Sequence, residues 1–238
     1  MKKLISVLAF AIVITTSAQN PVGAWEWTET SEDGKEVRAV VIFTEKYQVA
    51  TWYEAVTGAF ISTNGGTWEL NGNTMTEVPE FDTRDPEKSV GQSISFDIEW
   101  DGEDKLRIVG QESWITRIDS GEPGKLTGAW LISGRMRDGE IQERDTDRPR
   151  KTMKILSGTR FQWIAYNTET KQFMGTGGGS YTTIDGKYTE NIEFFSKDDS
   201  RVGASLEFNY EIKDGKWHHS GNNSRGEPMY EVWSKRVK

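Results

Sequence analysis

Residues 125–130 read KLTGAW and residues 21–25 read PVGAW, so the tripeptide Gly-Ala-Trp occurs twice in one chain. Four further landmarks follow each copy in the same order, which makes chance a poor explanation. The repeat therefore predicts two copies of one module in tandem. The other landmarks are TNGGTW at 63–68 with TGGGSY at 176–181, Thr-Glu at 76–77 with 189–190, FDIE at 96–99 with FNYE at 208–211, and Trp-x-x-Arg at 114–117 with 233–236.

The segment between the copies, Asp119-Ser-Gly-Glu-Pro-Gly124, is rich in turn-forming residues, as domain boundaries usually are. We predict a first barrel domain over residues 20–119 and a second over residues 125–238. Each has close to the common size of a folded domain, about 100 residues.

Alternating apolar residues and regularly spaced turns predict an all-β fold. Ten Trp, ten Phe and seven Tyr favour strands, and no amphipathic helix is evident beyond a short turn near each Gly-Ala-Trp. Asp-Gly or Asn-Gly pairs separate the strand-like runs, and such pairs are strong hairpin signals because both residues accept a positive φ. The alternating runs lie at 37–43, 47–53, 96–100 and 206–212, and the turn pairs at 33–34, 71–72, 101–102, 138–139, 185–186 and 214–215.

A chain of antiparallel hairpins has two unpaired edges unless its first and last strands meet. We therefore predict two closed up-and-down barrels, each with the Gly-Ala-Trp opening beside the Trp-x-x-Arg ending. An arginine over the indole would add roughly 0.5–2 kcal/mol of cation–π energy, which predicts the pairs Trp25–Arg117 and Trp130–Arg236. A strand follows the triglycine at 177–179, so we interpret it as a bulged strand at a barrel corner rather than a phosphate loop.

These residues resemble the lipocalin-like (calycin) superfamily, whose mark is a Gly-x-Trp near the start of an eight-stranded barrel and an arginine on the last strand. The second half, with KILSGTRFQW, GTGGGSYT, YTENIEFF and YEVWSKR, is similar to lipocalin-like domains of unknown function in secreted Bacteroidetes proteins. The resemblance implies a barrel with a pocket at its mouth. It implies a structural role for the Gly-x-Trp and arginine residues.

The N-terminal sequence MKKLISVLAFAIVITTSA has the features of a secretory signal peptide: two lysines, an apolar run from Leu4 to Ile14 and small residues at the end. We expect residues 1–18 to be removed after Ala18 and the protein to be secreted or periplasmic. The apolar run is shorter than the ~20 residues of a spanning helix, and no later segment is apolar enough, so no transmembrane segment is expected in the mature chain.

The mature chain is acidic and has no cysteine. Loss of Lys2 and Lys3 with residues 1–18, which contain no Asp or Glu, changes the formal net charge from −8 to −10. Such a surface repels nucleic acid and anionic lipid, so neither is an expected partner. The folded core must be stable without disulfides. The oligomeric state stays open.

His218 and His219 are adjacent and are the only two histidines in the chain. Neighbouring residues of a strand point to opposite faces, so both cannot ligate one metal. One inward histidine could serve a metal or haem; the alternative is packing against Trp217. With no cysteine to complete a zinc site, we predict no metal and no cofactor.

The strand-like run 188–195 places Glu193 on one face and Glu190 on the other, so we expect some carboxylate to enter the lumen. With Arg201 nearby, it would form either an anchor for a ligand head group or an internal ion pair. Opposite faces argue against a catalytic carboxylate pair, and two histidines leave little room for a Ser-His-Asp triad. The predicted ligand-binding residues are Trp163, Tyr166, Tyr181, Glu193, Arg201, Phe208, Tyr210 and His219.

The resulting hypothesis is a non-enzymatic secreted binding protein that holds a small apolar or amphipathic molecule, in the second barrel if only one is functional. Two alternatives stay open. One is a carbohydrate-binding accessory module, in which Trp52, Trp68 and Trp163 would form an exposed aromatic platform. The other is a structural or interaction protein with two solid barrels.

Overall fold

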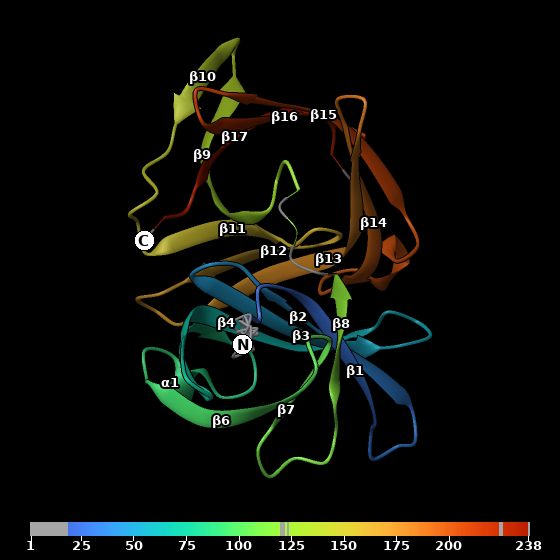
Figure 1. The fold of residues 1–238 in the computed structure, drawn as a ribbon. Coiled ribbons are helices and arrows are strands. Elements are labelled where there is room, and N and C mark those ends of the chain that lie inside the picture. The colour runs from blue at the N-terminus through green and yellow to red at the C-terminus, as the bar shows by residue number, and fades with distance from the viewer. Residues whose placement is uncertain (1–18, 120–121, 123, 224–225, 238) are drawn as a thin grey trace, which may run out of the picture.

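A computed structural model describes residues 19–119, 122, 124–223 and 226–237, and the predicted signal peptide lies outside these residues. The structure is almost entirely β, with strands arranged as two barrels, one beside the other (Figure 1). The first barrel contains β1 (Gly23–Thr30), β2 (Glu36–Phe43), β3 (Tyr47–Glu54), β4 (Phe60–Asn71), β5 (Thr74–Asp82), β6 (Ile94–Asp101), β7 (Lys105–Ile108) and β8 (Ile115–Asp119). The second contains β9 (Gly128–Arg137), β10 (Glu140–Glu143), β11 (Arg150–Leu156), β12 (Arg160–Asn167), β13 (Phe173–Ile184), β14 (Lys187–Phe195), β15 (Ser205–Lys213), β16 (Lys216–Asn222) and β17 (Pro228–Lys235).

Both sheets close, as predicted. Strand β1 pairs with β8 in the first barrel, and β9 pairs with β17 in the second. All pairings are antiparallel, and apart from the closing pairs each strand pairs with its neighbours in the sequence. Strand β10 is the exception, because it pairs only with β9. The second barrel is therefore formed by β9 and β11–β17. The prediction of two tandem antiparallel up-and-down barrels is confirmed.

Short helices occur at only two places in the described part of the chain. Helix α1 (Pro86–Ser89) follows β5, and the single 3-10 turn η1 (Asp199–Arg201) follows β14. The two occupy equivalent positions in the two copies of the repeat, and neither lies beside a Gly-Ala-Trp segment. Neither helix approaches the length and apolar character that a bilayer-crossing helix requires.

The two Gly-Ala-Trp segments adopt the same local structure. Each indole donates a hydrogen bond to the carbonyl oxygen four residues earlier, from Trp25 to Pro21 at 2.7 Å and from Trp130 to Leu126 at 2.8 Å. Each preceding glycine has a positive φ, 127° and 129°, which side chains rarely adopt. Both indoles are buried, and each packs into the core of its own barrel.

The predicted arginine–tryptophan contact forms in only one barrel. The Arg117 guanidinium carbon lies 4.0 Å from the Trp25 ring centroid. The prediction for Trp130 and Arg236 is wrong: Arg117 is the strand partner of Trp25, but Lys235, one residue earlier than Arg236, is the partner of Trp130. A shift of one residue moves a side chain to the opposite face of a strand.

Arg236 consequently leaves the second barrel and reaches the first. Its guanidinium carbon lies 4.0 Å from the Tyr47 ring centroid, and its nitrogens bind both carboxylate oxygens of Glu80 at 2.7 and 2.9 Å. The arginine that was expected to seal its own barrel therefore connects the two.

Glycine pairs create the same bulge in β4 and β13. The register with the next strand shifts between Gly65 and Gly66, and again between Gly178 and Gly179. A Cβ on Gly66 would lie 2.0 Å from a carbonyl oxygen, and so would one on Gly179, so the neighbouring strand leaves no room for a side chain. This confirms the bulged-strand interpretation of the triglycine. The six Asp-Gly or Asn-Gly pairs all occur at hairpin turns, as predicted, although Asn71 and Asp101 are themselves the last residues of β4 and β6.

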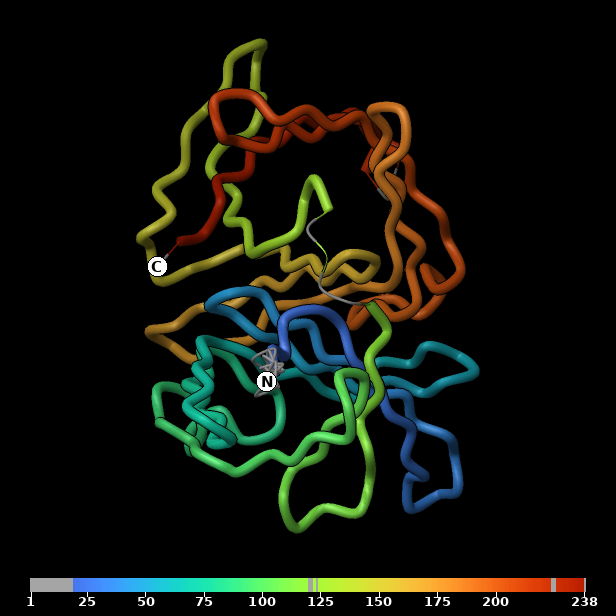
Figure 2. Tube along the Cα trace, viewed as in Figure 1, coloured from blue at the N-terminus to red at the C-terminus, as the bar shows by residue number. Residues whose placement is uncertain are grey.

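The barrels pack against each other through β2–β4 of the first and β11–β13 of the second (Figure 2). The contact has approximate two-fold symmetry: Phe60 stacks on its counterpart Phe173 with an interplanar angle of 8°. Strands β2, β3, β11 and β12 are therefore buried on both faces, one toward a lumen and one toward the other barrel. The shared core contains Ala24, Ile42, Tyr47, Val49, Phe81, Ala129, Leu131, Met153, Ile155, Ile164 and Tyr166.

Candidate ligand-binding site

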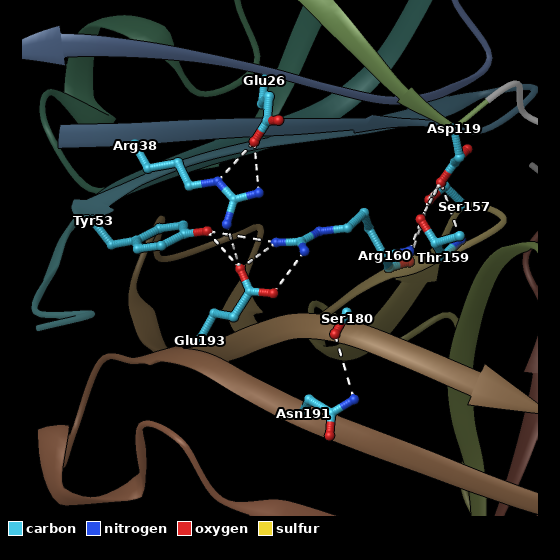
Figure 3. A network of polar contacts seen from close by, with 10 residues as sticks. All are labelled: Glu26, Arg38, Tyr53, Asp119, Ser157, Thr159, Arg160, Ser180, Asn191 and Glu193. Carbon is cyan, nitrogen blue, oxygen red and sulfur yellow. Dashed lines mark hydrogen bonds and ion pairs between the residues drawn. The ribbon is translucent and has the colours of Figure 1, made fainter. Parts of the chain in front are cut away.

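Glu193 lies between the barrels rather than inside the second one (Figure 3). It is the extra residue of the bulge opposite Gly178 and Gly179, and a bulge turns a side chain away from its regular face. Its carboxylate accepts hydrogen bonds from Arg160 at 2.5 and 2.6 Å, from Arg38 at 2.9 Å and from the Tyr53 hydroxyl at 2.9 Å. Glu193, predicted as a ligand-binding residue, therefore lies at the contact between the barrels and does not line the cavity of the second barrel.

Burial alone would raise the pKa of Glu193. Hydrogen bonds and charge from Arg160, with Arg38 and Tyr53, outweigh burial and lower this pKa below the usual carboxyl value. Glu193 is therefore an ionised cross-link between the two barrels. Glu80, its counterpart in the β5 bulge, connects the barrels in the opposite direction, because it accepts hydrogen bonds from Arg236 and Tyr166 of the second barrel.

The other predicted residues divide between the lumen and its surroundings. Tyr166 is fully buried at the barrel contact and donates to Glu80 at 2.6 Å, so it faces the first barrel rather than the lumen. Tyr181 is buried in the core of the second barrel, where its hydroxyl donates to the Ser157 carbonyl oxygen at 2.6 Å. Tyr210 is half-buried against the same core. Neither of these two lines the cavity described next.

A cavity of about 300 Å³ opens into the second barrel and brings four predicted residues together: Trp163, Arg201, Phe208 and His219. Its wall is aromatic and aliphatic, whereas its charged groups come from β9, β11, β14 and β17 and from η1. No described residue of this lining has a hydroxyl or thiol side chain. The remaining lining residues are Arg135, Lys154, Glu190, Ile192, Phe195, Ala204, Leu206, Asn223, Met229 and Glu231.

A buried ion pair lies in this cavity. Lys154 Nζ is 2.6 Å from Glu190 Oε1, and each side chain is 6% exposed. Four aromatic rings surround the ammonium group at 5.0 to 5.9 Å from their centroids, a range in which cation–π attraction acts. The rings belong to Tyr188, Phe208, Trp217 and Trp233.

His219 is the inward member of the histidine pair. It is 1% exposed and packs 4.2 Å from the Phe208 ring centroid, whereas His218 faces out and contacts the Tyr230 hydroxyl. Neither ring nitrogen of His219 has a hydrogen-bond partner, although Nδ1 lies 3.7 Å from Glu231. Burial, followed by the charge of Lys154, lowers the pKa of His219, so the imidazole is neutral near neutral pH.

Glu231 is held by Arg135. The carboxylate Oε1 lies 2.8 Å from Arg135 Nη2. Burial alone would raise the pKa of Glu231, but the approach of the His219 ring to 3.7 Å and the positive charges of Lys154 and Arg135 outweigh this and lower it. Glu231 is therefore ionised beside a neutral histidine.

The first barrel shows which of these residues the fold does not require. The strand partner of Trp25 is Val41, whereas the partner of Trp130 is Lys154. By the same register comparison, the counterpart of His219 is Ile108. An equivalent barrel therefore closes with apolar residues at both positions, and the lysine and the histidine of the lumen are specific to the second barrel.

The lumen glutamate occurs in both barrels with different surroundings. Glu77 is the counterpart of Glu190 in the repeated Thr-Glu landmark, but no lysine occupies the position of Lys154. Burial raises the pKa of Glu77 to about 7. Because its folded-state pKa lies above the unfolded value, Glu77 contributes stability at low pH that is lost as pH rises through about 7.

We therefore expect Glu77→Gln to stabilise the protein at alkaline pH. At pH ~8.5 the gain should reach up to about 3 kcal/mol, since the amide need not ionise in the barrel, and it should vanish near pH ~4.5. Urea unfolding of both proteins across this range measures the effect. Glu190→Gln provides the contrast, because it removes the partner of Lys154 and should destabilise at neutral pH. A pH-independent difference for Glu77→Gln would contradict the assignment.

Sequence reasoning did not select Lys154, Glu190, Glu231 or Arg135 as site residues. A signal for Glu190 existed, since it alternates with Tyr188 and Ile192, which also face the lumen. The lumen position of Lys154 could not be predicted from the sequence, because its neighbours Met153 and Ile155 are apolar and face the other barrel. The pairings of Lys154 with Glu190 and of Arg135 with Glu231 join separate strands.

Comparison with known proteins gives a family match to the second barrel. Residues 125–238 match the sequence model of a domain of unknown function, DUF4488. A solved structure of an uncharacterized protein from Bacteroides eggerthii DSM 20697 is similar over 46% of this chain and 98% of its own, with 16% identity and a TM-score of 0.32. A search of curated proteins found no match.

Proposed function

We propose that this is a secreted or periplasmic, non-enzymatic binding protein of the lipocalin-like kind, which holds a small amphipathic molecule in its second barrel. The observation that carries the proposal is the cavity of about 300 Å³ lined by His219, whose ring nitrogens are buried without partners. Buried polar atoms are normally hydrogen-bonded. A bound molecule would supply a hydrogen-bond partner for the imidazole of His219.

The first barrel has a supporting role in this proposal. Its lumen contains a cluster of apolar side chains around Trp25, Met75 and Ile98, with further aromatic residues packed against them. Together with the shared core, it supports β11 and β12, which form one wall of the second barrel. The ligand therefore belongs to the second barrel alone.

The absence of enzymatic activity is also part of the proposal. Lys154 and Glu190 neutralise each other, and Glu231 is bound to Arg135. A hydrolytic nucleophile of the serine or cysteine kind is missing from the described lining residues. These features favour binding over chemistry.

The carbohydrate-module alternative receives less support. Trp68 donates from its indole nitrogen to the Thr44 carbonyl oxygen and is half-buried. Trp52 packs edge-on against Trp27 in the first barrel, while Trp163 packs against Phe195 in the second. The three tryptophans named for that platform therefore do not share an exposed face.

The binding proposal is tested with the neutral fluorescent probe N-phenyl-1-naphthylamine. We expect saturable binding that Ala204→Trp weakens at least about ten-fold, because the indole would fill the cavity that buries the probe. Ser205→Trp is the matched control, since the neighbouring residue is exposed on the opposite face and should change binding less than about two-fold. Absent binding to the wild-type protein, or equal effects of the two variants, would refute the proposal.

A further inference from the structure

The cavity of the second barrel has no uncompensated charge among its described lining residues. Lys154 pairs with Glu190, Arg135 pairs with Glu231 at 2.8 Å, and Arg201 pairs with Asp198, which lies just outside the lining, at 3.4 Å. Every ionic side chain that meets the cavity therefore has its counter-charge from the protein.

We propose that the cavity selects amphipathic molecules with an uncharged hydrogen-bonding head group, a hydroxyl or an amide, and discriminates against carboxylate and ammonium head groups. This inference rests on the proposed binding function and names the class of ligand. It follows from the charge pairing together with the unpartnered imidazole of His219.

His219 supplies the complementary group. A neutral imidazole has one N–H donor and one acceptor nitrogen. A hydroxyl or a primary amide can both donate and accept, so either can satisfy a ring nitrogen that is otherwise buried without a partner. A carboxylate can serve only the N–H and an ammonium only the acceptor nitrogen, whereas a hydroxyl or an amide can serve whichever of the two faces the cavity.

A charged head group would be costly at this position. It would either remain unpaired in a largely apolar enclosure or displace one member of an existing pair. Displacement from the Lys154–Glu190 pair would leave the released partner buried at 6% exposure. Breaking a buried pair from one side is strongly unfavourable.

The wall chemistry matches the other part of such a molecule. Trp163 and Phe195 pack against each other with centroids 5.5 Å apart, and Leu206 and Met229 lie against the same core. These side chains surround the cavity and offer an apolar surface for an alkyl or ring moiety. The cavity is therefore amphipathic without being charged overall.

The experiment compares four compounds with one decyl chain: decanol, decanamide, decanoate and decylamine. Each displaces N-phenyl-1-naphthylamine from the wild-type protein at about pH 7.5, where the acid and the amine are ionised. We expect the alcohol and the amide to bind at least about ten-fold more tightly than the two ions, because burial of an unpaired charge opposes binding.

Two variants then alter the charge balance. Glu190→Gln leaves Lys154 uncompensated and should improve the affinity for decanoate relative to decanol by at least about ten-fold. Lys154→Met leaves Glu190 uncompensated and should improve the affinity for decylamine relative to decanol by a similar factor. Glu77→Gln, the equivalent change in the first barrel, should leave the order unchanged. Thermal unfolding confirms that each variant is folded, and the wild-type comparison tests the proposal without any variant.

The outcomes separate the two proposals. Probe binding with a preference for decanoate or decylamine overturns the head-group inference and leaves the binding function standing. Probe binding with no preference among the four compounds also overturns it. A wild-type protein that binds neither the probe nor any of the compounds overturns both.

Discussion

Replacing Gly179 with alanine is expected to destabilise the protein by more than about 4 kcal/mol, enough to prevent folding of the second barrel. An added Cβ would lie 2.0 Å from the Asn191 carbonyl oxygen, and φ at this residue is 158°. The contact is with backbone, so no side chain can rotate away. Gly66→Ala should have a comparable effect, because its Cβ would lie 2.0 Å from the Val78 carbonyl oxygen.

The matched control is Gly186→Ala in the adjoining hairpin turn. Gly186 also has a positive φ, 77°, but no atom lies within 4 Å of an added Cβ. We expect a cost of only about 1 kcal/mol from the backbone conformation. Yield of soluble protein and urea unfolding measure both variants. Similar stability of the Gly179 and Gly186 variants would show that the bulge does not require close strand approach.

Replacing Glu193 with alanine is expected to cost about 3–5 kcal/mol, because it leaves buried positive charge at the contact between the barrels. Arg160, whose side chain is 7% exposed, would lose both of its bonds to this carboxylate, and Arg38 would lose one (Figure 3). Asn191→Ala is the control. Asn191 lies two residues away and is exposed. Its side chain donates to the Ser180 hydroxyl at 3.4 Å and accepts from the Ser205 hydroxyl at 3.0 Å, both in exposed positions, so the change should stay within about 0.5 kcal/mol.

The effect of Glu193→Ala should also depend on pH. Because the folded-state pKa of Glu193 is lowered, its contribution is fully present above the ordinary carboxyl pKa and is lost as pH falls through the folded value. Urea unfolding at neutral and at acidic pH should show a large difference between wild type and variant that shrinks on acidification. A difference that is constant with pH would contradict an ionised cross-link.

The candidate site was only partly predictable from the sequence. Phe208 and His219 were predicted because alternation within one strand is local information. Glu193 was misplaced because one extra residue at the bulge turned it outward, and the signal for that bulge lies on another strand at Gly178 and Gly179. Tyr166 was misplaced because a strand buried on both faces presents aromatic residues to two different cores.

The sequence by itself determined the duplication, the hairpin turns and the closure of each barrel, since glycines with positive φ, Asp-Gly pairs and two-residue periodicity act over a few residues. Only the tertiary structure decided how the barrels pack, where Arg236 points and which charges share a lumen. These depend on register between strands that are distant in sequence. One residue of register separates the Arg117–Trp25 contact from the Arg236–Glu80 cross-link.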